Sequence, residues 1–195
     1  MTDPTPIKHV CTLAGILAVG KTSAVHSYVT GTVSFPHDYV PTIYGDDLIK
    51  NCDKELDLII RDTAGRADYT PIRHKAYKDA SVVLLCFCVG NSRSLDSIIS
   101  KWHEEVKSHA PDALIVVVGM QSDLRDDEEF KKAGIQCVNP RDAKDVCREV
   151  GACLYLECSS KDIPSVNRLF ERVKNIATNP PKSLPRWQKG ECAIQ

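Results

Sequence analysis

Residues 15–22 read Gly15-Ile16-Leu17-Ala18-Val19-Gly20-Lys21-Thr22. They match the pattern Gly-x-x-x-x-Gly-Lys-Ser/Thr at every fixed position, and a chance match in such a chain is expected less than about once in a hundred. The glycines let backbone N–H groups close around phosphate oxygens, and a helix that starts there adds partial positive charge. We expect Lys21 to neutralise the outer phosphates and Thr22 to offer its hydroxyl to magnesium. The stretch predicts a phosphate-binding loop; a plain glycine-rich turn entering a helix is the alternative.

The sequence around this loop alternates between short apolar runs and amphipathic stretches of helix length. Helices are predicted over residues 21–30, 94–108, 140–150 and 163–177, where apolar residues recur at three- and four-residue spacing. Strands are predicted over Ile7 to Ala14, Leu56 to Ile60, Val82 to Val89, Leu114 to Gly119 and Leu154 to Leu156. Near-continuous apolar strands separated by helices indicate an α/β fold with a parallel sheet, whose ligands bind at the carboxyl ends of the strands.

One segment departs from this alternation. Gly45 to Cys52 and Leu56 to Arg61 flank three charged residues with no helix between them, which predicts an antiparallel hairpin at one sheet edge. The sequence therefore predicts a mostly parallel six-stranded sheet with one antiparallel edge strand and helices on both faces.

The composition is that of one globular domain. The chain has 195 residues, of which 43% are apolar and 26% charged, and its 25 basic and 26 acidic residues leave a net charge of -1. No global positive field attracts nucleic acid, so we expect no nucleic-acid partner. No apolar run reaches the length of a membrane span. Nine cysteines, an odd number, without paired spacing indicate reduced core thiols in the cytosol.

A second phosphate-binding element follows the strand predicted to end near residue 61. Asp62-Thr63-Ala64-Gly65 places a carboxylate where it can hold magnesium through water, followed by a glycine whose N–H can approach a terminal phosphate. Alone the pattern is common. After the loop of residues 15–22 it becomes specific.

With these elements in place, the chain resembles Ras-superfamily small GTPases, and within them the Rho/Rac branch, over about residues 7 to 178. The resembling segments are the first switch at Phe35 to Tyr44, the second switch at Tyr69 to Tyr77, a helix at Lys101 to Val106, and base-recognition loops at Ser122 to Asp127 and Tyr155 to Lys161. The resemblance implies a P-loop NTPase fold and a GTP-binding molecular switch that signals to effectors in cytoskeletal or membrane-traffic pathways.

The resemblance also implies the site residues. Asp123 would accept both guanine N–H donors, the Ser160 N–H would reach the base oxygen and Phe35 would flank the ring; an acceptor-only carboxylate disfavours adenine independently of the resemblance. Mg²⁺ would be held by Thr22, Thr42 and Asp62, and Lys21, Thr42 and residue 66 would take part in hydrolysis. The implied GTP/GDP site comprises Gly15, Ala18, Val19, Gly20, Lys21, Thr22, Ser23, Phe35, Tyr39, Thr42, Gly65, Gln121, Asp123, Ser159, Ser160 and Lys161.

Three substitutions make this an atypical member. Leu17 replaces the usual glycine beside the γ-phosphate, and Arg66 replaces the glutamine that orients the attacking water; arginine has donors but no acceptor. We expect very slow hydrolysis and a mostly GTP-bound protein, although Arg66 could instead stabilise transition-state charge. Gln121 replaces the usual lysine over the base, which predicts weaker nucleotide affinity and faster exchange.

The predicted domain organisation is a GTPase domain over residues 1–178 and a flexible tail over 179–195. A short charged helix near residues 126–137 resembles the Rho-type insert. The chain ends in Cys192-Ala193-Ile194-Gln195, a C-a-a-X box whose glutamine favours farnesyl on Cys192. One lipid chain gives reversible binding, so we expect a cytoplasmic protein that visits the cytoplasmic face of plasma or internal membranes.

The expected partners are effectors that contact residues 35–46 and 66–78, together with exchange factors and a prenyl-binding solubilising protein; we expect a monomer. The alternatives are a nucleotide-independent scaffold of the same fold, a GTPase that cycles conventionally between GDP and GTP, and a P-loop kinase for a small molecule. The kinase would need an arginine-rich lid that the sequence does not display.

Overall fold

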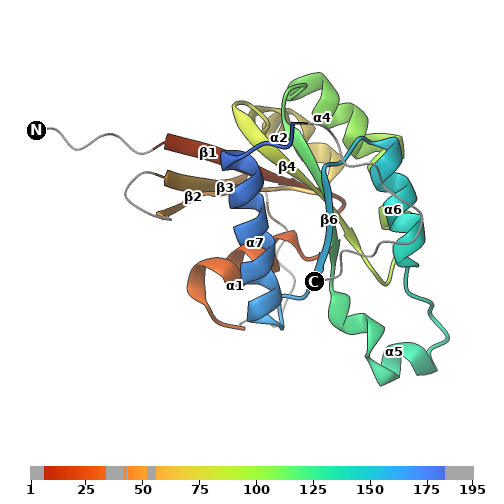
Figure 1. Ribbon diagram of the computed structural model, residues 1–195. Helices are drawn as coiled ribbons and strands as arrows, with labels where there is room; N and C mark the ends of the chain where they lie inside the picture. The colour runs from red at the N-terminus through yellow and green to blue at the C-terminus, as the bar shows by residue number, and fades with distance from the viewer. Residues whose placement is uncertain (1–6, 34–41, 43, 52–55, 183–195) are drawn as a thin grey trace, which may run out of the picture.

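A central sheet of six strands organises the molecule (Figure 1). The computed structural model describes residues 7–33, 42, 44–51 and 56–182, with the backbone alone for 44–51 and 56. The strand order is β2-β3-β1-β4-β5-β6. The bounds are β1 Ile7–Ala14, β2 Tyr44–Asn51, β3 Leu56–Thr63, β4 Ala80–Cys88, β5 Leu114–Met120 and β6 Leu154–Cys158. All six predicted strands are present.

The pairing directions confirm the predicted topology. β2 pairs antiparallel with β3 at the sheet edge, while β1 pairs parallel with both β3 and β4. β5 continues the parallel sheet between β4 and β6. The carboxyl ends of five parallel strands therefore meet at one edge, which is where a doubly wound sheet binds its ligands.

The helices cover both faces of the sheet. The bounds are α1 Lys21–Thr30, η1 Ala67–Tyr69, α2 Thr70–Ala76, α3 Ser92–Ser97, η2 Ile98–His103, α4 Glu104–His109, η3 Ser122–Arg125, α5 Glu128–Lys132, α6 Pro140–Glu149 and α7 Ile163–Thr178. In Figure 1, α1 and α7 lie together on one face, and α4 and α6 on the other. α1 ends at Gly31, whose left-handed backbone (φ 67°) lets its N–H bond the Ser27 carbonyl.

Two apolar cores result, one on each side of the sheet. The Phe170 ring of α7 stacks on the Tyr28 ring of α1 with 4.2 Å between centroids in the first core, while Trp102 and Tyr77 fill the second. Near-continuous apolar strands make this possible because successive residues of β1, such as Leu13 and Ala14, belong to opposite cores. The predicted core thiols are confirmed as buried and free at Cys11, Cys86, Cys88, Cys153 and Cys158.

The helical prediction for residues 94–108 is confirmed with one difference. The run extends from Ser92 to His109, and its middle turn, η2, is a π-helix. A π-helical turn bonds residues five apart and shifts the positions of the side chains that follow. Trp102 lies in this turn, fully buried, with its indole N–H donating to the Ser97 hydroxyl at 3.2 Å.

The charged stretch after residue 126 forms the predicted short helix, α5. Its N-cap is Asp127, whose carboxylate accepts the Phe130 N–H at 3.0 Å, and its last turn carries Lys131 and Lys132. Acidic residues at the start and basic residues at the end complement the helix dipole.

Among the described residues, no helix is both long enough and apolar enough to cross a bilayer. The predicted tail lies outside the described residues from 183 onward, and so does Cys192.

The α1–α7 contact yields a stability prediction. Because Phe170 is fully buried against Tyr28, Phe170→Ala should lower the free energy of unfolding by about 3–5 kcal/mol through lost contacts and a residual cavity. Urea denaturation followed by circular dichroism measures the change. Ile135→Ala, at an exposed residue, should change it by less than about 0.5 kcal/mol. Equal effects of the two substitutions would contradict this view of the core.

Candidate functional site

The loop of residues 15–20 connects β1 to α1 and depends on glycine at both ends. A side chain at Gly15 would place its Cβ 2.3 Å from the Cys86 carbonyl oxygen, and the Gly15 backbone has φ +152°. Gly20 adopts φ +106° directly before α1. Both positions require glycine because the first permits close backbone approach and both have positive φ. The predicted strand–loop–helix arrangement is confirmed.

Lys21 lies inside this loop and closes it. Its ammonium donates to the carbonyls of Gly15 at 2.8 Å and Ile16 at 2.9 Å, and the residue is 5% exposed. Burial lowers the pKa of Lys21, while the nearby Cys86 and Asp62 oppose that shift. A buried ammonium with mobile donors can exchange a loop carbonyl for a phosphate oxygen.

Three oxygen-bearing side chains converge beside Lys21. The Thr22 hydroxyl donates to Asp62 Oδ2 at 2.5 Å, and the Thr42 hydroxyl lies 2.7 Å from that of Thr22 and 3.2 Å from the same carboxylate oxygen. Burial raises the pKa of Asp62, opposed by the Thr22 hydrogen bond and by Lys21. Residues far apart in the sequence thus form one oxygen cluster, which contains the three residues that the family resemblance implied.

This cluster fits a magnesium ion. Asp62 Oδ1 is buried and has no hydrogen-bond partner among the described residues, so one carboxylate oxygen remains to interact with a cation. Two hydroxyls and a carboxylate are hard oxygen ligands, the type that Mg²⁺ prefers. Thr22, Thr42 and Asp62 are therefore the residues that could hold it.

The chain after Asp62 passes directly over the phosphate-binding loop. A Cβ at Gly65 would lie 2.3 Å from the Leu17 nitrogen and 2.4 Å from the Ile16 carbonyl carbon. Thr63 fixes the end of β3 by donating its hydroxyl to the Leu13 carbonyl at 2.6 Å. Only glycine allows this approach, which brings the two predicted phosphate-binding elements together.

A pocket of about 260 Å³ opens on the other side of the loop. It is formed by the segments that follow β1, β5 and β6, and is lined by Gly20, Ser23, Gln121, Asp123, Leu124, Ser159, Ser160 and Lys161. The sequence predicted all of these residues except Leu124. The segments after these strands therefore bring Gln121, Asp123, Ser159, Ser160 and Lys161 to one cavity.

Asp123 is an acceptor-only group at the wall of this pocket. Its Oδ1 accepts from the Ser159 hydroxyl at 2.6 Å, and its Oδ2 pairs with the Lys161 ammonium at 2.7 Å. Burial alone would raise the pKa of Asp123, but the hydrogen bonds from Lys161 and Ser159 outweigh it and keep the pKa below its ordinary value. At neutral pH the carboxylate is charged and can accept N–H donors from a base.

Gln121 connects the pocket to the phosphate-binding loop. Its side-chain N–H donates to the Ala18 carbonyl at 3.0 Å, and its amide oxygen accepts from the Cys88 thiol at 3.2 Å. The residue itself has a left-handed backbone with φ 59°. This shorter, neutral side chain therefore still contacts the loop, a contact that the sequence expectation of a lost lysine did not include.

The two substitutions expected to affect hydrolysis lie at the surface of the site. Leu17 is 49% exposed, at the point where Gly65 crosses the loop. The Arg66 side chain is 52% exposed and pairs with Asp68 at 3.0 Å. The guanidinium at this position therefore has a carboxylate partner two residues later in the sequence.

The sequence reasoning missed some supporting residues. Arg125 forms two hydrogen bonds of 2.7 Å to Glu157, and these join the loop that carries Asp123 to β6. Arg125 and Glu157 carry opposite charges and lie in the two expected base-recognition loops, which could have indicated this ion pair. Cys88 was predicted to be a core thiol, and nothing in the sequence indicated its contact with Gln121.

The predicted site residues Phe35 and Tyr39 lie outside the described residues.

Comparison with known proteins agrees with this geometry. The model of the Ras family matches residues 10–179. The chain belongs to the Ras family. The Rho-related protein racC of Entamoeba histolytica is 34% identical over 198 residues, which cover 98% of this chain and 97% of racC. This Ras-family member is therefore a small GTPase of Rho/Rac type, as the sequence resemblance indicated.

The Gln121 contacts predict a change in nucleotide release. Gln121→Ala removes a hydrogen bond to the loop, worth about 0.5–1.5 kcal/mol, so GDP should dissociate roughly 2- to 12-fold faster. Stopped-flow release of a fluorescent GDP in excess magnesium measures the rate. Gln136→Ala, at an exposed glutamine, is the matched control and should leave the rate unchanged. An unchanged rate for Gln121→Ala would mean that its contact to Ala18 does not retain nucleotide.

Proposed function

We propose that this small GTPase is a magnesium-dependent Rho-type switch that hydrolyses GTP slowly and is mostly GTP-bound. The observation that carries the proposal is the side chain of Arg66, which has no acceptor for a water proton and is paired with Asp68. Family membership makes it a GTP-binding switch protein. The slow hydrolysis is specific to this chain.

The proposed nucleotide position follows from the two halves of the site. Backbone N–H groups of residues 15–20, with Lys21, would bind the phosphates, and the pocket beside Asp123 would bind guanine. An adenine would place its N1 acceptor against the carboxylate, and the lone pairs that face each other would lack a donor, at a cost of about 1–3 kcal/mol. That mismatch supports guanine over adenine.

The proposed magnesium site is the cluster of Thr22, Thr42 and Asp62. When bound, Mg²⁺ would neutralise phosphate charge. Thr42 belongs to the segment before β2 whereas Thr22 lies in the first turn of α1, so their contact supports a role for residue 42 in linking the nucleotide to the first switch. The remainder of that switch, residues 34–41 and 43, lies outside the described residues.

Two features support slow hydrolysis. Hydrolysis needs a group that orients the attacking water, and an arginine side chain can donate to that water but cannot accept its proton. Leu17 adds a branched side chain where the loop meets Gly65, and it would obstruct an arginine supplied by a partner. Such an arginine contributes about 10³ to 10⁵ in rate in related GTPases.

We also propose that this protein exchanges its bound nucleotide faster than a family member with the usual lysine at position 121. Gln121 contacts Ala18 with a neutral hydrogen bond, whereas a lysine there would add a charged one, and charged hydrogen bonds are about twice as strong. Nucleotide occupancy would then follow the cellular GTP/GDP ratio rather than exchange factors alone.

Rho-family proteins generally bind effectors, exchange factors and dissociation inhibitors. For this chain we propose effector binding through residues 35–46 and 66–78, and reversible membrane attachment through a farnesylated Cys192. A single prenyl chain with a modest basic tail gives weak attachment, which supports exchange between membrane and cytoplasm.

The nucleotide content of the purified protein tests the proposal. Lipid-free wild-type chain, kept in magnesium throughout, is denatured and the released nucleotide is separated by ion-exchange chromatography. GTP in excess over GDP is the expected result because hydrolysis is slow. Mostly GDP would contradict slow hydrolysis, and a protein that neither carries nor binds guanine nucleotide would instead support the nucleotide-independent scaffold.

The role of Arg66 predicts the effect of restoring glutamine. Arg66→Gln supplies both an acceptor and a donor for water, so single-turnover GTP hydrolysis should accelerate by about tenfold or more. Arg66→Ala, which removes the charge without adding an acceptor, is the matched control and should not accelerate it. If Arg66→Ala slows hydrolysis instead, Arg66 stabilises transition-state charge and the proposal of an inactive position is wrong.

A further inference from the structure

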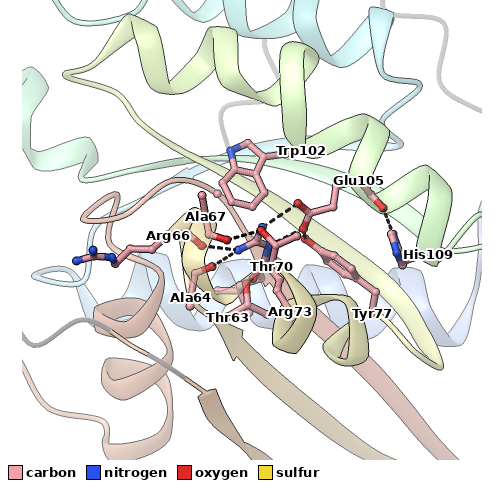
Figure 2. A network of polar contacts seen from close by, with 12 residues as sticks. Thr63, Ala64, Arg66, Ala67, Thr70, Arg73, Tyr77, Trp102, Glu105 and His109 are labelled. Atoms are coloured by element: carbon pink, nitrogen blue, oxygen red, sulfur yellow. Dashed lines mark hydrogen bonds and ion pairs between the residues drawn. The ribbon is translucent and has the colours of Figure 1, made fainter.

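Arg73 of α2 is a fully buried cation that the switch description above does not use. Its guanidinium is held by Glu105 of α4, with Nε 2.5 Å from Oε1 and Nη2 2.8 Å from Oε2 (Figure 2). The Arg73 side chain is 0% exposed and that of Glu105 is 9% exposed. The face of the guanidinium lies 4.7 Å from the centre of the Trp102 ring, which belongs to the π-helical turn.

The remaining donors of Arg73 bind the backbone on both sides of Gly65 and the side chain of Thr70. Nη1 donates to the carbonyls of Ala64 at 2.8 Å and Arg66 at 3.0 Å, and Nη2 also donates to the Thr70 hydroxyl at 3.0 Å. Together with the bonds to Glu105, these contacts number five, as many as the N–H groups of a guanidinium.

The two carbonyls that Arg73 binds belong to the neighbours of Gly65. Gly65 is the residue that lies on the phosphate-binding loop, with its Cβ position 2.3 Å from the Leu17 nitrogen. Figure 2 shows the Arg66 side chain extending away from Arg73, so only the backbone of Arg66 takes part. The position of Gly65 over the loop is therefore coupled to a helix on the far side of the second switch.

Glu105 is itself held in place. Its Oε1 accepts the Tyr77 hydroxyl at 2.9 Å, and burial, which would raise the pKa of Glu105, is outweighed by the hydrogen bonds from Arg73 and Tyr77. A buried ion pair gains little net stability because both charges lose water. A pair that is fully satisfied and bonded to the carbonyls of Ala64 and Arg66 is better explained by a positioning role.

We propose that Arg73, held by Glu105, is the positioning residue that keeps Gly65 over the phosphate-binding loop and thereby sets the preference of the site for GTP over GDP. The inference rests on the proposed function. We expect the Gly65 N–H to approach a terminal phosphate, which GDP lacks, so loss of this placement weakens triphosphate binding and leaves diphosphate binding nearly unchanged. A purely structural ion pair would affect both nucleotides alike.

The test compares the affinities of the full chain for a non-hydrolysable GTP analogue and for GDP, by calorimetry in magnesium. Arg73→Lys keeps the charge but has too few donors for Glu105, Thr70 and both carbonyls. The analogue should bind at least fivefold more weakly to this variant, with GDP affinity changed less than twofold. Glu105→Gln is a second variant that keeps the shape of the partner, and it should shift the ratio of affinities in the same direction.

Arg125→Lys is the matched control because Arg125 makes a similar double contact to Glu157, on the side of the base pocket. It should lower both affinities by the same factor. If Arg73→Lys and Glu105→Gln also leave the ratio unchanged, Arg73 is only structural and the inference is overturned while the proposed function stands. A wild-type chain that binds neither nucleotide would overturn both.

Discussion

The site depends on backbone lying against backbone without a side chain between. Gly15 brings the start of the phosphate-binding loop against the Cys86 carbonyl, and Gly65 brings the end of the β3 segment against Leu17. Any Cβ at these two positions would overlap its neighbour. Lys21 then occupies the space inside the loop, with its ammonium on two loop carbonyls. The arrangement of β1, β3 and β4 makes these approaches possible, and the oxygen cluster and the pocket are built on either side of them.

Much of the fold was predictable because the buried strands and amphipathic helices have different periods. α2 was not predicted as a helix, since its most buried side chain is Arg73, a charged residue that hides the apolar pattern. The π-helical turn at Trp102 was not predicted either, because the apolar spacing of residues 94–108 fits an ordinary helix. The burial of Arg73 depends on Glu105, 32 residues away, and such a contact leaves no pattern in the local sequence.

The site residues were predictable to the extent that their chemistry is carried by short motifs. Asp123, Ser159 and Lys161 meet in one pocket as predicted, because parallel strands end at the same edge. The contact of Gln121 with Ala18 was not predictable, since it depends on a left-handed backbone at residue 121. Gln121 thus keeps a hydrogen bond to the phosphate-binding loop at a position where the family resemblance led us to expect a lysine.

Six of the seven cysteines in the described residues are buried, free thiols. Burial raises the pKa of Cys153 to about 11 and those of Cys147 and Cys158 to about 12, so almost no thiolate exists at neutral pH. Electrophiles and peroxides react with thiolates, and the closed core therefore protects these sulfurs. Transient opening removes that protection, and an oxidised sulfur cannot return to an apolar site without a desolvation cost. Loss of the native state under oxidising conditions would then become irreversible, and the lifetime of the protein there would depend on its rate of unfolding.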